Sequence, residues 1–263
     1  MTALAPFQRV GPALIHARAR TGRGRAVVFA NSLGTSLRLW DEVVDLLPED
    51  APLLRWDMRG HGLSEGPAAP IEAHAADLAA IMDRAGIADA VVCGVSMGGM
   101  VAIALAAARP DLVGGLVLAC TGARIGTAEM WDARIRAVRE AGLGPIAGDV
   151  IARWLSEAWR AANPDATTGW RLMLERTPPG GYAAACEAIA AADLRTAAAG
   201  LRVPAACLAG TEDLSTPPSV VEALTDLIPG AALTVLPGVG HLPPIEAPEV
   251  VARTITAMRD GLK

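Results

Sequence analysis

The sequence lacks the features that mark membrane, exported and nucleic-acid-binding proteins. Hydrophobic residues make up 52% of the 263 residues, but much of that share is alanine, and no apolar run approaches the roughly 20 residues that a spanning helix needs. Residues 1–20 contain no apolar core of the signal-peptide type. The net charge of −5 is accompanied by no basic stripe. We therefore expect a cytoplasmic protein that binds neither membranes nor nucleic acid, and an anionic substrate would need a local cation.

Cysteine and histidine are too few and too scattered along the chain to indicate a metal centre. The four cysteines are widely spaced and form no Cys-x-x-Cys pair (Cys93, Cys120, Cys186 and Cys207). Three of them end short apolar runs or lie near such ends, where a small thiol is usually buried. Four histidines limit metal chemistry further. We expect no disulfide, no metal and no other cofactor.

Short apolar runs alternate with helical patterns over most of the chain. The runs predict strands, and the patterns between them predict helices. The expected strands are 13–19, 26–30, 52–56, 90–93, 116–120, 205–209 and 232–236. The expected helices are 37–47, 71–85, 97–109, 218–227 and 247–262. This alternation favours an α/β fold with a mostly parallel, doubly wound sheet, in which strand 13–19 lies at an edge.

The alternation stops between residues 121 and 195. This segment shows helical patterns at 128–141, 145–156, 168–176 and 182–192, no convincing strand, and four of the six tryptophans. A helical segment inserted between two strands of a sheet is typical of a lid. We therefore expect a core made of residues 1–120 and 196–263, with residues 121–195 as a helical cap.

A candidate nucleophile lies where a predicted strand meets a predicted helix. The segment Gly94-Val95-Ser96-Met97-Gly98 has the Gly-x-Ser-x-Gly spacing of a nucleophile elbow. In that turn the serine adopts a strained backbone conformation, and its neighbours must carry almost no side chain. The turn would present Ser96 Oγ at the carboxyl end of the sheet, above the N-terminus of the following helix.

A serine nucleophile needs a base and an acid. Among the histidines, only His241 follows the last predicted strand, and Asp213 follows the strand before it, in the order Ser, acid, His of this kind of site. Glu212 is the adjacent alternative acid. Of the other histidines, we expect His16 and His74 on the surface and His61 in a structural role.

The reaction also needs donors for a developing oxyanion. The backbone N–H of Met97, directly after the candidate nucleophile, is one expected donor. The second should come from the loop after strand 26–30, where Leu33 is the expected residue.

With these residues in place, the sequence resembles the α/β-hydrolase fold family and, within it, the 3-oxoadipate enol-lactonases. The triad motifs are shared by many hydrolases, whereas the Asn-Ser-Leu-Gly loop and the segments of the cap narrow the choice. The resemblance covers nearly the whole chain and is carried by Asn31-Ser32-Leu33-Gly34-Thr35, Trp40-Asp41, Asp57–Gly62, Ser96–Gly99, Ala123–Gly126, Trp131, Gly181-Tyr182, Cys186–Ile189, Ala192–Arg195, Gly210–Asp213 and Gly240-His241.

The resemblance implies a carboxylic ester hydrolase that opens a small lactone carrying a carboxylate, within the β-ketoadipate pathway of aromatic catabolism. Ser32 and Trp131 are candidate substrate-binding residues. Arg134 lies one helical turn from Trp131 and is the candidate partner of the substrate carboxylate. Arg124 is the alternative cation. The sequence does not indicate the oligomeric state.

Three departures from the family pattern leave the substrate open. Trp56 stands where a tyrosine is expected, residues 183–185 are all alanine, and Leu242-Pro243-Pro244 is unusually stiff. The alternatives are a carboxylesterase or a carbon–carbon bond hydrolase with the same triad, and, from another class, a ligand-binding protein with little turnover. A haloalkane dehalogenase is disfavoured, because its chemistry uses an aspartate where Ser96 stands.

Overall fold

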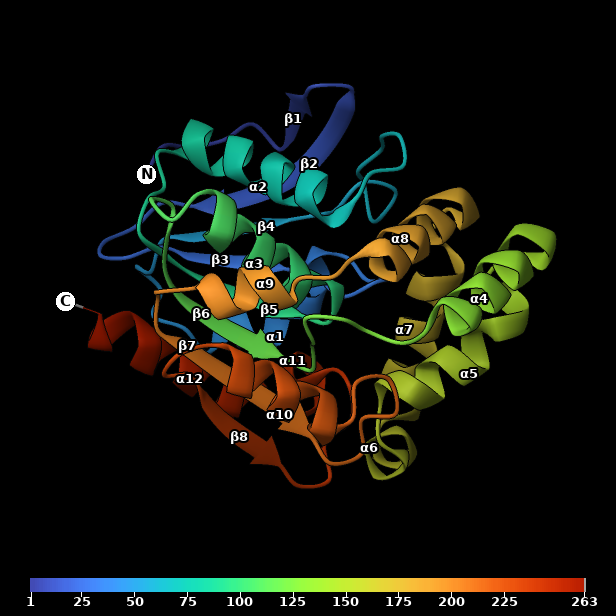
Figure 1. Cartoon of the computed structure of the whole chain (residues 1–263). Coiled ribbons are helices and arrows are strands. Elements are labelled where there is room, and N and C mark those ends of the chain that lie inside the picture. The colour runs from blue at the N-terminus through green and yellow to red at the C-terminus, as the bar shows by residue number, and fades with distance from the viewer. Residues whose placement is uncertain (263) are drawn as a thin grey trace.

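The chain folds around one eight-stranded sheet (Figure 1). The computed structural model describes residues 1–262. The strand order is β1-β2-β4-β3-β5-β6-β7-β8; β1 and β2 are antiparallel to their neighbours, and the other strands run parallel. The strands are β1 Phe7–Val10, β2 Ala13–Arg20, β3 Val27–Ala30, β4 Leu53–Trp56, β5 Ala90–Val95, β6 Val113–Ala119, β7 Ala205–Gly210 and β8 Ala232–Leu236. The mostly parallel α/β sheet predicted from the sequence is confirmed.

Helices cover both faces of the sheet (Figure 1). One face carries α2 (Ile71–Ala85), α3 (Met97–Ala108), α9 (Arg195–Gly200) and α10 (Pro218–Leu227), and the other carries η1 (Leu37–Trp40), α1 (Asp41–Asp45), α11 (Pro243–Glu246) and α12 (Pro248–Gly261). All residues of β3 and β5 are buried between these layers. Burial on both faces explains why these strands read as unbroken apolar runs. Within residues 1–262 no helix is long and apolar enough to cross a membrane.

The prediction of an edge strand at 13–19 is wrong. β2 pairs with β1 on one side and with β4 on the other, so that β1 forms the edge. β1 has only four residues, most of them exposed or half-buried. A strand this short and solvated produces no apolar run, so no sequence pattern predicts it.

The segment between β6 and α9 is helical, as predicted. It contains α4 Ala128–Ala141, α5 Gly144–Trp154, α6 Glu157–Ala162, α7 Pro164–Glu175 and α8 Pro179–Ala191. These five helices gather beyond one end of the sheet (Figure 1). The short helix α6 was not predicted. We refer to residues 121–195 as the cap.

Two histidines expected on the surface are buried instead. His16 is 9% exposed and His74 is 3% exposed. His16 lies in β2, which is an interior strand, and its Nδ1 lies 2.8 Å from Asp57 Oδ2. His74 lies on the buried face of α2. His61 is fully buried in the loop after β4, which agrees with a structural role.

Candidate active site

Ser96 occupies a strained turn between β5 and α3. Its φ of 56° and ψ of −120° place it outside the regions that residues with side chains normally adopt. Within residues 1–262 only Asp89 and Cys120 share a positive φ among the non-glycine residues. Strain of this kind persists only where the surrounding structure holds it, and it gathers at functional sites.

The flanking glycines make this turn possible. A Cβ atom on Gly94 would overlap the carbonyl oxygen of Gly98, and one on Gly98 would overlap the carbonyl of Ala30. The hydroxyl of Thr121, just after β6, donates a 2.6 Å hydrogen bond to the carbonyl of Ser96. The turn is therefore packed between β3 and β6, and side chains at the glycine positions would push it out of place.

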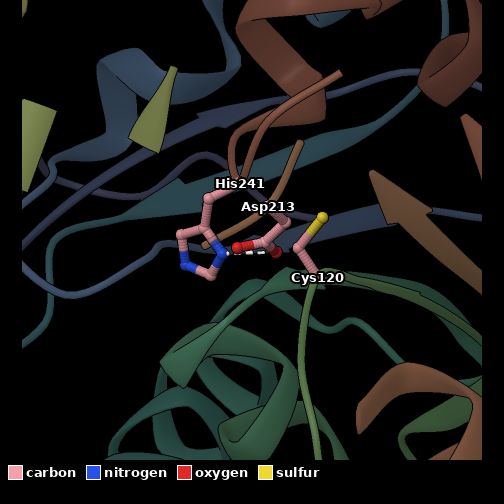
Figure 2. Close-up of side chains that lie close together, drawn as sticks. All are labelled: Cys120, Asp213 and His241. Carbon is pink, nitrogen blue, oxygen red and sulfur yellow. Dashed lines mark hydrogen bonds and ion pairs between the residues drawn. The ribbon is translucent and has the colours of Figure 1, made fainter. Parts of the chain in front are cut away.

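Asp213 and His241, in the loops that follow β7 and β8, form a buried pair (Figure 2). Asp213 Oδ2 lies 2.8 Å from His241 Nδ1 and accepts a 2.7 Å hydrogen bond from the Thr216 hydroxyl. Asp213 Oδ1 accepts hydrogen bonds from the backbone N–H groups of Ser215 and Thr216.

The environment keeps the Asp213 carboxyl ionised. Burial favours the neutral acid, but the charge and hydrogen bonds of His241 and Thr216 outweigh it, so the pKa of Asp213 lies below its usual value. Glu212, the alternative acid, is exposed. Of the two, Asp213 is therefore the carboxylate that contacts the histidine.

Contacts from the cap and from α11 hold the loop that carries His241. The N–H of His241 donates a 2.8 Å hydrogen bond to the carbonyl of Trp154 at the end of α5. Glu246 Oε1 accepts a 2.9 Å hydrogen bond from the N–H of Gly240, and its carboxylate also accepts hydrogen bonds from Ser156. The sequence gives no sign of these contacts, because no motif joins residues 154–156 to residues 240–246.

A narrow cavity of about 50 Å³ lies beside Ser96 and His241. No hydrogen bond joins these two side chains within the described chain, but both line this cavity. Ser32, Leu33, Trp131 and Arg134, all expected from the sequence, line it too, whereas Arg124 does not. Its remaining walls are Ile125, Met130, Arg153, Trp154, Tyr182, Ile189, Leu214 and Ser215.

The two expected oxyanion donors have free backbone N–H groups within the described chain. Neither the N–H of Leu33 nor that of Met97 donates to an acceptor among residues 1–262. Leu33 lies in the loop after β3, and Met97 is the first residue of α3. The Ser32 hydroxyl is also buried without a hydrogen-bond partner among the described residues. Ser32 and Leu33 line the cavity beside Ser96, whereas Met97 is fully buried and is not among its lining residues.

Arg134 is held over the indole of Trp131. Its guanidinium carbon lies 5.7 Å from the ring centroid, and its Nη1 donates a 3.5 Å hydrogen bond to the Tyr182 hydroxyl. Burial, with a smaller effect of Cys186, raises the pKa of Tyr182 to about 12, so this hydroxyl stays neutral. The cavity therefore contains a half-buried cation on an aromatic wall.

Cys120 lies next to the Asp213–His241 pair (Figure 2). Donor atoms of the three buried residues lie within 4.8 Å of one another, although the sequence gave no reason to group them. Burial raises the pKa of the Cys120 thiol well above its usual value. His241 Nδ1 and Asp213 Oδ2 already contact each other, so the thiol lies beside two atoms that are engaged in their own hydrogen bond.

The fold and this site agree with comparisons to known proteins. A model of the alpha/beta hydrolase fold family matches residues 25–248. The chain belongs to the α/β-hydrolase family. Family members commonly differ in substrate, so the more similar individual proteins carry further information.

The chain is similar to several kinds of α/β-hydrolase, among them enol-lactonases and an esterase. The 3-oxoadipate enol-lactonase 2 of Acinetobacter baylyi is 33% identical over 235 residues, which are 89% of this chain and 88% of that protein. The crystal structure of the enol-lactonase from Burkholderia xenovorans has a TM-score of 0.92 and 36% identity and covers 96% of this chain and 99% of its own. A thermophilic esterase from Thermogutta terrifontis has a TM-score of 0.88 and 32% identity, with coverages of 95% and 94%. The chain is a hydrolase, and its resemblance to enol-lactonases is confirmed.

Proposed function

We propose that this hydrolase opens 3-oxoadipate enol-lactone to 3-oxoadipate through a Ser96–His241–Asp213 acyl-enzyme mechanism. The observation that carries the proposal is the single cavity lined by Ser96, His241 and the cation Arg134. The similarity to two proteins named as enol-lactonases supports the choice of substrate. The reaction belongs to the β-ketoadipate pathway of aromatic catabolism, and we place it in the cytoplasm.

Ser96 and His241 carry out the first proton transfer. Ser96 Oγ attacks the lactone carbonyl carbon, and His241 Nε2 takes the hydroxyl proton. The 2.8 Å contact of His241 Nδ1 with Asp213 supports this direction, because an Nδ1–H donated to a carboxylate leaves Nε2 as the free acceptor. Asp213 then stabilises the imidazolium.

Leu33 and Met97 stabilise the tetrahedral intermediate. Their free backbone N–H groups are the donors for the oxyanion, which also lies above the N-terminus of the 12-residue helix α3. This contribution depends on the backbone alone, so the identities of the two side chains matter less than their positions.

Arg134 and Trp131 bind the carboxylate end of the substrate. A guanidinium group pairs with a carboxylate through two parallel N–H···O bonds, and Trp131 and Tyr182 fix its position. The unpaired hydroxyl of Ser32 supplies a further hydrogen bond. Residues 121–195, which contribute Trp131, Arg134 and Tyr182, act as a cap domain on a core of residues 1–120 and 196–263.

The chemistry of the leaving group completes the cycle without a metal or cofactor. Breaking the acyl C–O bond opens the ring and forms an enolate, which is a better leaving group than an alkoxide, and the enolate takes the proton that His241 holds. The enol then becomes a ketone, so the group that could close the ring again is lost. Water activated by His241 hydrolyses the acyl-enzyme and releases 3-oxoadipate.

The test compares two substrates in two proteins. We would measure kcat/KM for enzymatically generated 3-oxoadipate enol-lactone and for a p-nitrophenyl ester, with the native chain and with Ser96→Ala. Fast lactone opening, slow ester hydrolysis and loss of both in the variant are expected. Lactone opening that is slow, or that persists without Ser96, would contradict the proposal.

The second candidate is a general carboxylesterase, and the similarity to the Thermogutta esterase favours it. The same comparison separates the two, because an esterase would prefer the p-nitrophenyl ester. The remaining alternative is a ligand-binding protein with little turnover. In such a protein a reactive-serine probe would not label Ser96.

A further inference from the structure

A second and larger cleft lies between the core and the cap, with a volume of about 850 Å³. Its core wall comes from β2, the start of η1 and the loop after β4, and its cap wall from α7 and the residues that follow it. Ser96 and His241 do not line it. The proposed reaction therefore makes no use of this cleft.

The cleft carries an excess of positive charge. Four arginines and two aspartates line it. Asp41 is shared by Arg38 and Arg55, which form ion pairs with its two carboxylate oxygens. Arg18 on β2 and Arg176 at the end of α7 are exposed, and neither side chain has a hydrogen-bond or ion-pair partner among residues 1–262. Two guanidinium groups, one from the core and one from the cap, are thus free to bind anions.

The carboxylate oxygens of the second aspartate, Asp57, already have partners within the protein. Its Oδ2 contacts His16 Nδ1 at 2.8 Å and accepts a hydrogen bond from the N–H of Leu63, and its Oδ1 accepts one from the N–H of Leu37. Asp57 is 2% exposed, so water screens little of its interaction with the histidine.

His16 adds a further polar group to the lining of the cleft. Its side chain is 11% exposed and lines the cleft. Because Nδ1 faces Asp57, the second ring nitrogen, Nε2, has no partner among the described residues. With Nδ1 in contact with Asp57, this nitrogen is available to a molecule in the cleft.

We propose that the cleft binds a small organic dianion with two carboxylate groups, held between Arg18 of the core and Arg176 of the cap. Guanidinium groups bind carboxylates in a bidentate fashion, which favours them over single-point contacts. The two free arginines come from different walls of a roomy cleft, so one ligand with an acidic group at each end satisfies both.

The site lies next to the loop that carries Leu33. Thr35, Ser36 and Leu37 line the cleft, and the N–H and hydroxyl of Thr35 both donate to the carbonyl of Ser32. On the cap side, the hydroxyl of Thr177, next to Arg176, lies 3.5 Å from the carbonyl of Gly34. A ligand that joins Arg18 to Arg176 therefore ties the end of α7 to the core beside this loop.

Calorimetric titration with adipate, a six-carbon dicarboxylate, tests the proposal at low ionic strength. Saturable binding to the native chain is expected. Arg18→Gln and Arg176→Gln should each weaken it about tenfold or more, since each removes one charge-assisted contact. Arg136→Gln, which removes an exposed arginine of α4 outside the cleft, controls for the change in net charge and should bind adipate as the native chain does.

Arg134→Gln distinguishes the cleft from the cavity at Ser96. Adipate binding to the cleft should survive this substitution whatever the true substrate of the enzyme. The proposal is wrong if the native chain shows no saturable binding, or if Arg134→Gln abolishes binding while Arg18→Gln and Arg176→Gln leave it intact. It is equally wrong if hexanoate or inorganic phosphate binds as tightly as adipate, because the second carboxylate would then contribute nothing.

Discussion

The carboxylate of Glu246 accepts a 2.5 Å hydrogen bond from the hydroxyl of Ser156. Glu246 lies in α11 and Ser156 precedes α6, so the bond joins the core to the cap. The same carboxylate accepts a hydrogen bond from the N–H of Gly240, the residue before His241. Through these contacts the half-buried carboxylate of Glu246 positions the candidate catalytic base.

Removing this acid should impair catalysis more than folding. We expect Glu246→Ala to lower kcat about tenfold, because small displacements of a catalytic group are costly. Glu246→Gln keeps an acceptor oxygen and should retain most of the activity. Glu249→Ala, an exposed change nearby, serves as the control. Steady-state kinetics with unchanged kcat in Glu246→Ala would contradict the positioning role.

Asp213 and the adjacent Glu212 should respond very differently to loss of charge. Asp213→Asn should reduce kcat by roughly 10³- to 10⁴-fold, because an amide no longer selects the reactive tautomer of His241 or stabilises its cation. Glu212→Gln should leave kcat unchanged, since Glu212 is exposed. Equal effects of the two substitutions on kcat would show that the acid has been misassigned.

Arg134 should affect binding of the charged substrate specifically. Arg134→Gln is expected to raise KM for the lactone about tenfold or more, as befits loss of a charge-assisted contact, with a smaller change in kcat. Its KM for a neutral p-nitrophenyl ester should stay the same. Arg124→Gln is the matched control, because Arg124 lies outside the cavity. An unchanged KM for the lactone in Arg134→Gln would remove this residue from the mechanism.

Substitution by alanine should change the stability of the protein in opposite directions at two glycines. A Cβ on Gly98 would overlap the carbonyl oxygen of Ala30, so Gly98→Ala should cost about 2 kcal/mol or more of stability and disturb the turn at Ser96. Gly148 lies exposed inside α5 with open space around it. Gly148→Ala should stabilise the protein by about 0.5–1 kcal/mol with unchanged activity. Urea unfolding measures both changes, and a tolerated Gly98→Ala would contradict the packing argument.

His74 should make the protein less stable in mild acid. Burial, with smaller effects of His61 and Arg59, lowers the pKa of His74 from 6.5 to about 3. Between these values the unfolded chain binds a proton that the folded chain does not, so stability is complete above the unfolded pKa and falls as the pH decreases.

The lowered pKa of His74 predicts a measurable loss of stability in mild acid. For His74 alone the free energy of unfolding should decrease by about 2 kcal/mol between about pH 7.5 and about pH 5. In His74→Leu the free energy of unfolding should fall by about 2 kcal/mol less over the same pH range. All other titrating groups are the same in the two proteins. Urea unfolding curves of the two proteins at both pH values test this, and parallel pH profiles would show that His74 is not buried as a neutral residue.

Much of the architecture was predictable because it depends on neighbours along the chain. The bounds of α2, α4, α10 and β8 agree with their predictions from periodicity, proline and glycine. The turn at Ser96 is also local: a β-branched strand, two glycines and a small-residue helix suffice to define it. Elements without a strong local pattern, such as β1 and α6, were missed.

What the sequence by itself determined is the α/β order of elements, the position of Ser96 in its turn, and the chain order in which Asp213 and His241 follow it. Only the tertiary structure decided which polar groups meet across the chain. It buried His16 against Asp57 and His74 within the fold, joined Glu246 to Ser156, and brought Arg18 and Arg176 to one cleft. Periodicity reports which face of an element is apolar, whereas contacts between residues far apart depend on how the elements pack, and no local pattern encodes that packing.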